Sequence, residues 1–366
     1  MGSRAAIGER PGRRSLTWAG ALAAVVAVGL AMAASGPPAG TTVAAPGRPR
    51  CACRTTGHLA ARRTADHRAT GHRATGDRTT HRWMVAEWRN KVGGARLAGR
   101  GIVEASRAPA LPGVPASAYV VANAATGAVL AAKDAHGEFP PASTLKVLTA
   151  ITMLRRLRPD ATIVASRLAA SAVPNIVGLV PGRRYRVADL FRALLMISAN
   201  DAAVSLVQGT GSFTKGMALV NAEARRLRAY DVIAKLPNGL PAPGQVVSAY
   251  DLALIARQAL AMPAFLRYDE TLTSTFYGSR FGQVPLVNQN ALLTQYPGAI
   301  GGKIGWTLRA GATYIGMARR NGVTLIVTIL HATPLTEIAS AERLLDWGFA
   351  ANGRVRPVGV LVRPLR

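Results

Sequence analysis

The sequence predicts an α+β fold in which an antiparallel β-sheet packs against helices and carries an inserted helical lobe. Strand-like runs flank turn residues at both ends of the globular part, over 118–132 and again over 310–330. Apolar segments with helical periodicity fill the stretch between them. Strands from the two ends of such a domain can join one sheet, so the intervening helices must form a covering layer and a lobe.

The N-terminal segment predicts export from the cytoplasm. Arg13 and Arg14 precede an apolar run from Leu16 to about Ala34. A basic start followed by an apolar run is typical of a secretory signal, and this run is also long enough to span a bilayer. We therefore assign residues 1–36 to a signal peptide or N-terminal membrane anchor. The expected location is extracytoplasmic, in the cell envelope, with the protein either anchored or secreted.

The composition of residues 37–110 predicts a disordered linker, and the globular domain is expected over 111–366. The linker is rich in Arg, His, Gly and Pro and offers few large aliphatic side chains to offset chain entropy. The only cysteines are Cys51 and Cys53, which lie too close in sequence for an unstrained disulfide. A zinc site with His58 or His67 is conceivable, but incidental linker residues explain the pattern better, and we expect no metal.

The charge does not indicate nucleic-acid binding. The formal net charge is +27 and the pI is about 11.6. However, the chain contains no zinc finger, no interleaved aromatic and basic residues and no RNP-like motif. A basic surface instead favours anionic cell-wall polymers or a membrane through long-range attraction.

The elements follow in order along the globular part. Runs 118–123 and 127–132 predict a hairpin, and an apolar helix begins after Pro140 and Pro141 and ends before Pro159. A helix pair is expected over 187–207. Its periodicity is interrupted by polar residues at 198–201, and buried polar groups need partners or a function.

Further helices are expected over 212–226 and 248–261, the second capped by Ser248. Near the C-terminus, Asn321 and Gly322 separate two apolar runs of period two, which is a strong hairpin signal. A helix over 337–350 and a last strand within 355–362 complete the predicted domain.

Ser143 and Lys146 provide a candidate nucleophile and base. At spacing i, i+3 the two side chains share one face of a helix, so a hydroxyl and an amine can meet. A helix N-terminus stabilises a developing oxyanion, and a lysine kept neutral by its pocket can act as general base. The spacing alone is a weak signal, because an isolated serine here is more often a helix cap.

Three motifs in order strengthen this interpretation: Ser143-x-x-Lys146, Ser198-x-Asn200 and Lys303-Ile304-Gly305. The set resembles the S-x-x-K, S-x-N and K-T-G motifs of penicillin-recognising serine enzymes. The surrounding phrases over about 115–350 are similar to those of D-alanyl-D-alanine carboxypeptidases, the low-molecular-mass penicillin-binding proteins. A second S-x-x-K, Ser212 to Lys215, has no S-x-N after it.

The resemblance implies a β-lactamase/transpeptidase-like fold and a serine carboxypeptidase that needs no cofactor. It implies peptidoglycan pentapeptide stems as substrates, β-lactams as inhibitors and no nucleic-acid partner. Ser143, Lys146 and Ser198 would be catalytic, as nucleophile, general base and proton relay. The substrate would contact the remaining residues of the set, with the backbone N–H of Trp306 in the oxyanion hole: Asn200, Lys303, Gly305, Trp306 and Thr307.

Two departures from the family pattern bear on activity. Ile304 replaces the threonine of the third motif, and Gln289 stands where several members have a basic residue. Each lost hydrogen bond to a charged group costs on the order of 1.5–3 kcal/mol, although Thr307 and Arg309 can substitute. The alternatives are a weakly active or non-catalytic penicillin-binding homologue and, with less support, a β-lactamase, for which no deacylating E-x-x-L-N phrase is present.

Overall fold

A computed structural model describes residues 92–106 and 108–366, and its centre is an antiparallel sheet. The strand order is β1-β3-β2-β10-β9-β8, with β11 also paired to β3. The predicted sheet, assembled from the two ends of the domain, is thereby confirmed. The strands are β1 (Ile102–Glu104), β2 (Ala116–Asn123), β3 (Ala128–Lys133), β8 (Ala299–Thr307), β9 (Gly311–Arg320), β10 (Val323–Ala332) and β11 (Gly359–Val360).

The pairing of β9 with β10 follows from the Asn-Gly turn. Asn321 and Gly322 have φ values of 48° and 76°, the left-handed conformation that a tight hairpin requires at both central positions. The turn sets the register, in which Ile326 lies opposite Met317. On its other side β10 pairs with β2, with Ile326 opposite Ala122, which joins the two ends of the domain.

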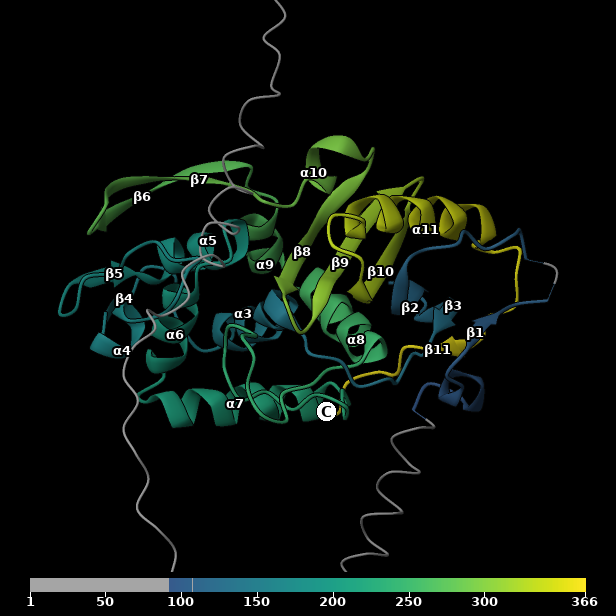
Figure 1. The fold of residues 1–366 in the computed structure, drawn as a ribbon, viewed down its shortest axis with the longest axis horizontal. Helices are drawn as coiled ribbons and strands as arrows, with labels where there is room; N and C mark the ends of the chain where they lie inside the picture. The colour runs from purple at the N-terminus through teal and green to yellow at the C-terminus, as the bar shows by residue number, and fades with distance from the viewer. Residues whose placement is uncertain (1–91, 107) are drawn as a thin grey trace, which may run out of the picture. The chain divides into compact units, whose positions relative to one another are not determined.

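Both faces of the sheet are covered by helices (Figure 1). On one face α11 (Glu337–Ala351) packs Leu344 and Leu345 among side chains of β2, β9 and β10. On the other face lie α3 (Leu145–Leu154) and α8 (Ala249–Leu260). Because side chains alternate along a strand, Val120 and Val121 are both buried but in different layers.

The remaining helices and two small two-stranded sheets form the inserted part between β3 and β8 (Figure 1). The predicted break in the 187–207 segment separates α5 from α6. Neither small sheet was predicted: β4 pairs with β5 across a long connection that contains α4, and β6 and β7 form a hairpin. The elements are β4 (Thr162–Val164), α4 (Arg167–Ala170), β5 (Arg184–Arg186), α5 (Val187–Met196), α6 (Asn200–Gln208), α7 (Phe213–Arg226), α9 (Pro263–Asp269), β6 (Thr273–Ser279), β7 (Gly282–Val287) and α10 (Leu292–Gln295).

The fold begins earlier than the expected boundary near Leu111. A short 3₁₀ segment, η2 (Ala95–Ala98), buries Leu97 completely, and β1 pairs with the end of β3. These residues fall within the range 37–110 that the composition assigned to a linker. The sequence pattern of η2 and β1 does not indicate ordered structure, because the two elements bury few large apolar side chains of their own. They depend instead on contacts with distant parts of the chain.

The predicted signal or anchor over 1–36 and most of the predicted linker lie outside the described residues. Within 92–106 and 108–366, no helix combines the length and apolar character needed to cross a membrane. In that same range no cluster of three His, Cys, Asp or Glu side chains could hold a metal ion.

The position of Leu97 predicts that the N-terminal segment contributes to stability. Leu97→Ala removes a fully buried side chain and should lower the free energy of unfolding of the full chain by about 2–5 kcal/mol. Leu308→Ala is the matched control, because this side chain is 92% exposed and its loss should cost less than about 0.5 kcal/mol. Urea unfolding measures both. Equal effects of the two substitutions would show that η2 does not pack as described.

Candidate active site

Ser143 and Lys146 meet as their spacing predicts. Ser143 lies in a 3₁₀ turn, η3 (Ala142–Thr144), and Lys146 lies in the first turn of α3. The Nζ atom of Lys146 is 2.8 Å from the Oγ atom of Ser143 and donates to the backbone carbonyl of Asn238 at 2.9 Å. The candidate nucleophile and the candidate base are therefore within the distance needed for proton transfer.

Two hydrogen bonds and one close backbone approach fix the turn that carries Ser143. The hydroxyls of Thr144 and Thr313 both donate to the carbonyl of Pro141, at 2.5 and 3.0 Å. Gly239 has φ +80°, and a β-carbon there would lie 1.7 Å from the carbonyl oxygen of Ala142. Only glycine permits this approach, so the loop that supplies the Asn238 carbonyl lies directly against the nucleophile turn.

Lys146 is completely buried, which controls its charge. Burial lowers the pKa of its amine well below the usual value, and the nearby positive charge of Lys303 lowers it further. A neutral amine 2.8 Å from a serine hydroxyl can accept its proton. The environment therefore suits Lys146 to the predicted role of general base.

Lys303 on β8 faces a buried acid that the sequence did not reveal. Asp269, at the end of α9, is buried and accepts a hydrogen bond from the Gly302 N–H at 2.7 Å. Burial raises the pKa of Asp269 to about 7, against the opposing effects of that N–H group and of Lys303. Burial lowers the pKa of Lys303 to about 8, while Asp269 raises it. Asp269 thus helps to keep Lys303 charged near neutral pH.

Ser198 and Asn200 lie at the start of α6, which packs against α3. Ser198 has φ +63°, an unusual conformation for a non-glycine residue and one that is often found at functional sites. The side chain of Asn200 donates to the carbonyl of Val173 at 2.9 Å. Within the described residues, Ser198 Oγ and Asn200 Oδ1 are buried without a hydrogen-bond partner. Such groups can serve a substrate.

Asp201 holds the loop next to Ser198 and Asn200 in place. It was not among the site residues predicted from the sequence. Its carboxylate accepts hydrogen bonds from the backbone N–H groups of Val177, Gly178 and Leu179 at 2.8–3.1 Å. The loop before them is also tied to α6, because the N–H of Asn200 donates to the carbonyl of Asn175 at 2.7 Å. The polar run 198–201 therefore contains candidate site residues, Ser198 and Asn200, together with Asp201, which holds the neighbouring loop in place.

The edge strand β8 brings the third motif to the nucleophile. Gly305 lies so close that a β-carbon there would be 2.7 Å from the backbone nitrogen of Ser143. The carbonyl of Ile304 accepts from Lys303 Nζ at 2.9 Å, so it faces the open edge of the sheet. Backbone groups alternate in direction along an antiparallel strand, which places the N–H of Trp306 on the same edge. This arrangement suits an oxyanion hole shared with Ser143.

The two departures from the family pattern have different surroundings. Ile304 is partly buried against the apolar layer on the α11 face of the sheet. The backbone N–H of Gln289 donates to the carbonyl of Met196 at 2.9 Å, and its side chain carries no charge. Thr307 accepts a hydrogen bond from the Ala310 N–H at 3.0 Å, and Arg309 is exposed. Among the described residues, Arg309 has no hydrogen bond or ion pair, which leaves its guanidinium available to a carboxylate.

The second S-x-x-K has a structural role. The Oγ atom of Ser212 accepts a hydrogen bond from the backbone N–H of Lys215 at 3.1 Å and caps α7. Both residues are exposed. Ser212 is therefore an ordinary helix cap.

Comparisons with known proteins agree with this geometry. A family described as D-alanyl-D-alanine carboxypeptidase matches residues 104–334. D-alanyl-D-alanine carboxypeptidase DacB2 of Mycobacterium tuberculosis is 39% identical over 248 residues, covering 66% of this chain and 85% of that protein. For three further curated relatives, the match covers between 62% and 65% of their length.

Solved structures are similar over the same region. A D-alanyl-D-alanine carboxypeptidase from M. tuberculosis H37Rv has a TM-score of 0.67 at 38% identity, covering 70% of this chain and 99% of the other. The DD-transpeptidase of Streptomyces K15 has a TM-score of 0.63 at 26% identity, covering 66% and 100%. These findings confirm the predicted fold class, and the chain belongs to the D-alanyl-D-alanine carboxypeptidase family.

Proposed function

We propose that this protein removes the terminal D-alanine from peptidoglycan stem peptides through an acyl-enzyme on Ser143. The observation that carries the proposal is the buried amine of Lys146, 2.8 Å from the Ser143 hydroxyl, in a chain that belongs to the carboxypeptidase family. A neutral lysine next to a serine activates the serine hydroxyl as the nucleophile of an acyl transfer.

The first half of the reaction forms an ester. Lys146 takes the proton of the Ser143 hydroxyl while Oγ attacks the carbonyl carbon between the two D-alanines. The resulting oxyanion accepts hydrogen bonds from the N–H groups of Ser143 and Trp306. As the C–N bond breaks, Ser198 passes the proton from Lys146 to the departing amine. Ser198 suits this relay because its buried hydroxyl has no other partner among the described residues.

Water completes the cycle by hydrolysing the ester. Lys146 takes a proton from the water as its oxygen attacks the acyl carbon, and Ser143 leaves with that proton. The products are the shortened peptide and the free enzyme. This step distinguishes a carboxypeptidase from a transpeptidase, in which an amine attacks instead.

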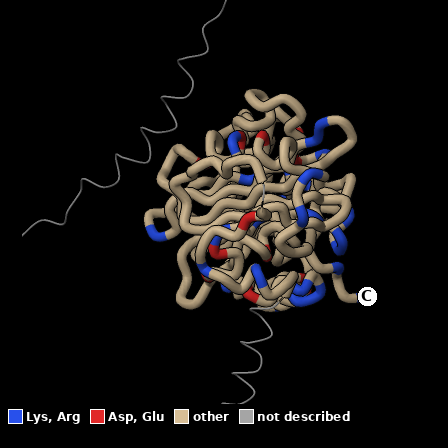
Figure 2. Tube along the Cα trace, turned by 90° about the vertical axis from the view of Figure 1, so that its right-hand side faces the viewer, with Lys and Arg blue, Asp and Glu red and all other residues tan. Residues whose placement is uncertain are grey.

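Two features would recognise the substrate: the positive charges of Lys303 and Arg309, and the side chain of Asn200. Lys303, kept charged by Asp269, attracts the terminal carboxylate, and Arg309 can assist from the β8–β9 turn. Asn200 bonds the substrate amide through its unpartnered Oδ1 atom. Lys and Arg outnumber Asp and Glu along the described chain, which favours approach of anionic wall material (Figure 2).

The family places the enzyme outside the cytoplasm, in contact with the cell wall, and implies binding of β-lactams. We further propose that residues 1–36 direct export, as a signal peptide or as a retained anchor. Residues 37 to about 91 would then connect that segment to the catalytic domain.

A weakly active wall-peptide binder is a second candidate function, favoured by Ile304. The apolar side chain offers no hydroxyl to the substrate carboxylate. The intact Ser143–Lys146 pair argues for turnover, so we rank this alternative below catalysis.

Release of D-alanine tests the proposed function. The full chain should release D-alanine from a peptide ending in D-Ala-D-Ala and should be labelled by a fluorescent penicillin, whereas Ser143→Ala should do neither. Ser212→Ala is the matched control. It should retain both activities while losing about 1 kcal/mol of stability with its helix cap. Labelling without D-alanine release would identify a binding protein, and labelling of Ser143→Ala would exclude Ser143 as nucleophile.

The rate of D-alanine release should depend on pH through two lysines. As pH falls through the lowered pKa of Lys146, the amine gains a proton and acylation slows. As pH rises above about 8, Lys303 loses its charge and KM for the peptide increases. Lys146→Arg, whose guanidinium stays protonated, should slow acylation by about 10²–10⁴-fold at every pH. A rate that continues to rise toward the ordinary lysine pKa would contradict a neutral Lys146.

Restoring the family threonine tests the importance of Ile304. Ile304→Thr should lower KM for the peptide by roughly tenfold, the equivalent of one hydrogen bond to a carboxylate. Ile304→Val, which keeps an apolar β-branched side chain, is the control and should leave KM unchanged. An unaltered KM in Ile304→Thr would show that Thr307 and Arg309 already hold the carboxylate.

A further inference from the structure

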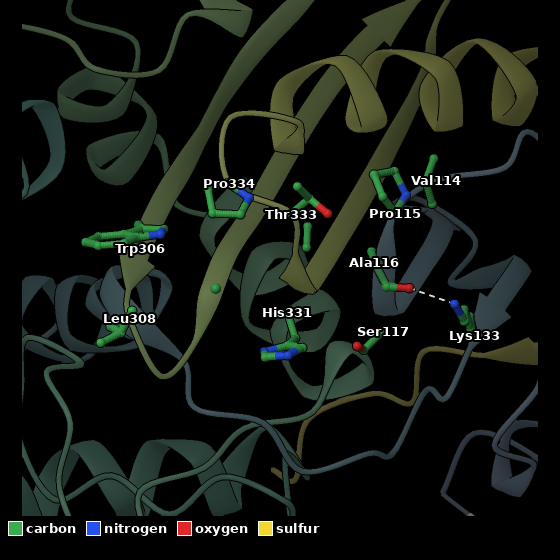
Figure 3. Close-up of a pocket in the computed structure, with 12 residues that line it drawn as sticks. Val114, Pro115, Ala116, Ser117, Lys133, Trp306, Leu308, His331, Thr333 and Pro334 are labelled. Carbon is green, nitrogen blue, oxygen red and sulfur yellow. Dashed lines mark hydrogen bonds between the residues drawn. The ribbon is translucent and has the colours of Figure 1, made fainter. Parts of the chain in front are cut away.

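A recess behind Trp306 takes no part in the proposed mechanism. It has a volume of about 570 Å³ and lies where β2, β3, β8 and β10 end or begin (Figure 3). Trp306 and Leu308 line one side, Ser117 and Lys133 line the other, and His331 and Pro334 lie between them (Figure 3). A cavity of this size accommodates a small ligand.

The lining groups indicate the chemistry of such a ligand. Trp306 is 58% exposed and Leu308 is 92% exposed, so an apolar wall faces solvent. Among the described residues, Lys133 and His331 are the only ionisable ones that line the recess, and no carboxylate accompanies them. The Nζ atom of Lys133 donates to the Ala116 carbonyl at 2.7 Å, which leaves further N–H donors for a ligand. The recess therefore suits a ligand with an apolar face, many acceptor oxygens and no positive charge.

The strand β8 links this recess to the site of acylation. A substrate whose carboxylate lies at Lys303 and whose scissile carbonyl lies at Ser143 and Trp306 must extend its remaining residues toward the β8–β9 turn. Leu308 and Arg309 form that turn. Because side chains alternate along a strand, Trp306 points away from the face on which Gly305 meets Ser143. The recess thus lies just beyond the turn, on the side that Trp306 faces.

A stem peptide is long enough to pass the β8–β9 turn. Three residues lie between the scissile D-alanine unit and the sugar, and in an extended chain they span about 10 Å. We propose that the recess binds the amino-sugar glycan to which the stem peptide is attached. The inference rests on the proposed function, because that function sets the direction of the substrate.

The sugar ring would stack its C–H face on the Trp306 indole, as apolar surfaces do with aromatic rings. Its acetamido and hydroxyl oxygens would accept hydrogen bonds from Lys133 and Ser117. A sugar hydroxyl would donate to Nε2 of His331, because the Nδ1–H of that ring donates to the Ala310 carbonyl at 3.1 Å. The muramyl carboxyl carbon is part of the link to the peptide, so the glycan presents mainly neutral acceptors. The absence of acidic side chains from the lining fits this ligand better than a polyamine or a basic peptide.

The first test compares two substrates. A pentapeptide attached to its disaccharide should have a kcat/KM about tenfold above that of the free pentapeptide, which is the gain expected from one or two ligand hydrogen bonds. Lys133→Ala and Ser117→Phe should reduce this ratio to about one, by removing a donor and by filling the recess. Lys215→Ala, an exposed lysine on α7, is the control and should keep the wild-type ratio.

The second test measures binding without catalysis. Full-length Ser143→Ala protein should bind the disaccharide without a peptide, and Ser117→Phe added to it should abolish binding at unchanged melting temperature. D-alanine release with no disaccharide binding and a substrate ratio of one in the wild type would overturn the glycan site alone. Disaccharide binding without D-alanine release would overturn the proposed function and still support the recess as a saccharide site.

Discussion

The burial of Lys146 is the constraint on which the rest of this structure depends. A lysine amine loses hydration when it is buried, and the cost falls on its charged form. Here the amine lies against Ser143 Oγ and the Asn238 carbonyl. A neutral amine can accept a hydrogen bond from the first partner and donate one to the second. The second buried lysine, Lys303, adds positive potential to the same pocket and opposes protonation of the first.

Glycine and buried aspartate residues allow the two lysines and Ser143 to lie close together. Gly239 and Gly305 allow two separate chain segments to touch the turn that carries Ser143, closer than any side chain would permit. Asp269 offsets part of the cost of burying Lys303, and Asp201 holds the loop beside Asn200 through three backbone N–H groups. The sheet contributes the edge strand β8, whose outward-facing Trp306 N–H group suits the proposed oxyanion hole. The site therefore draws on the sheet and on the inserted helices alike.

Much of the fold and part of the candidate site could be predicted from the sequence, because these features depend on residues that are neighbours along the chain. The Asn321–Gly322 turn, the break at 198–201 and the Ser143–Lys146 spacing are of this kind, and each lies where expected. Asp269 could not be found, since it meets Gly302 across 33 positions and belongs to no motif. The same holds for η2 and β1, whose stability comes from packing of Leu97 and from pairing with β3 rather than from composition.

The central claim is that Lys146 is neutral before substrate arrives, and NMR of the full chain tests it directly. The protein has six lysines, so ¹³C-labelled lysine gives a spectrum in which Lys146→Arg identifies the signal of interest. The account predicts that the ε-carbon of Lys146 titrates well below the ordinary lysine value, and that Lys303 titrates near 8. Titration of Lys146 near the ordinary lysine value of about 10.4 would contradict it.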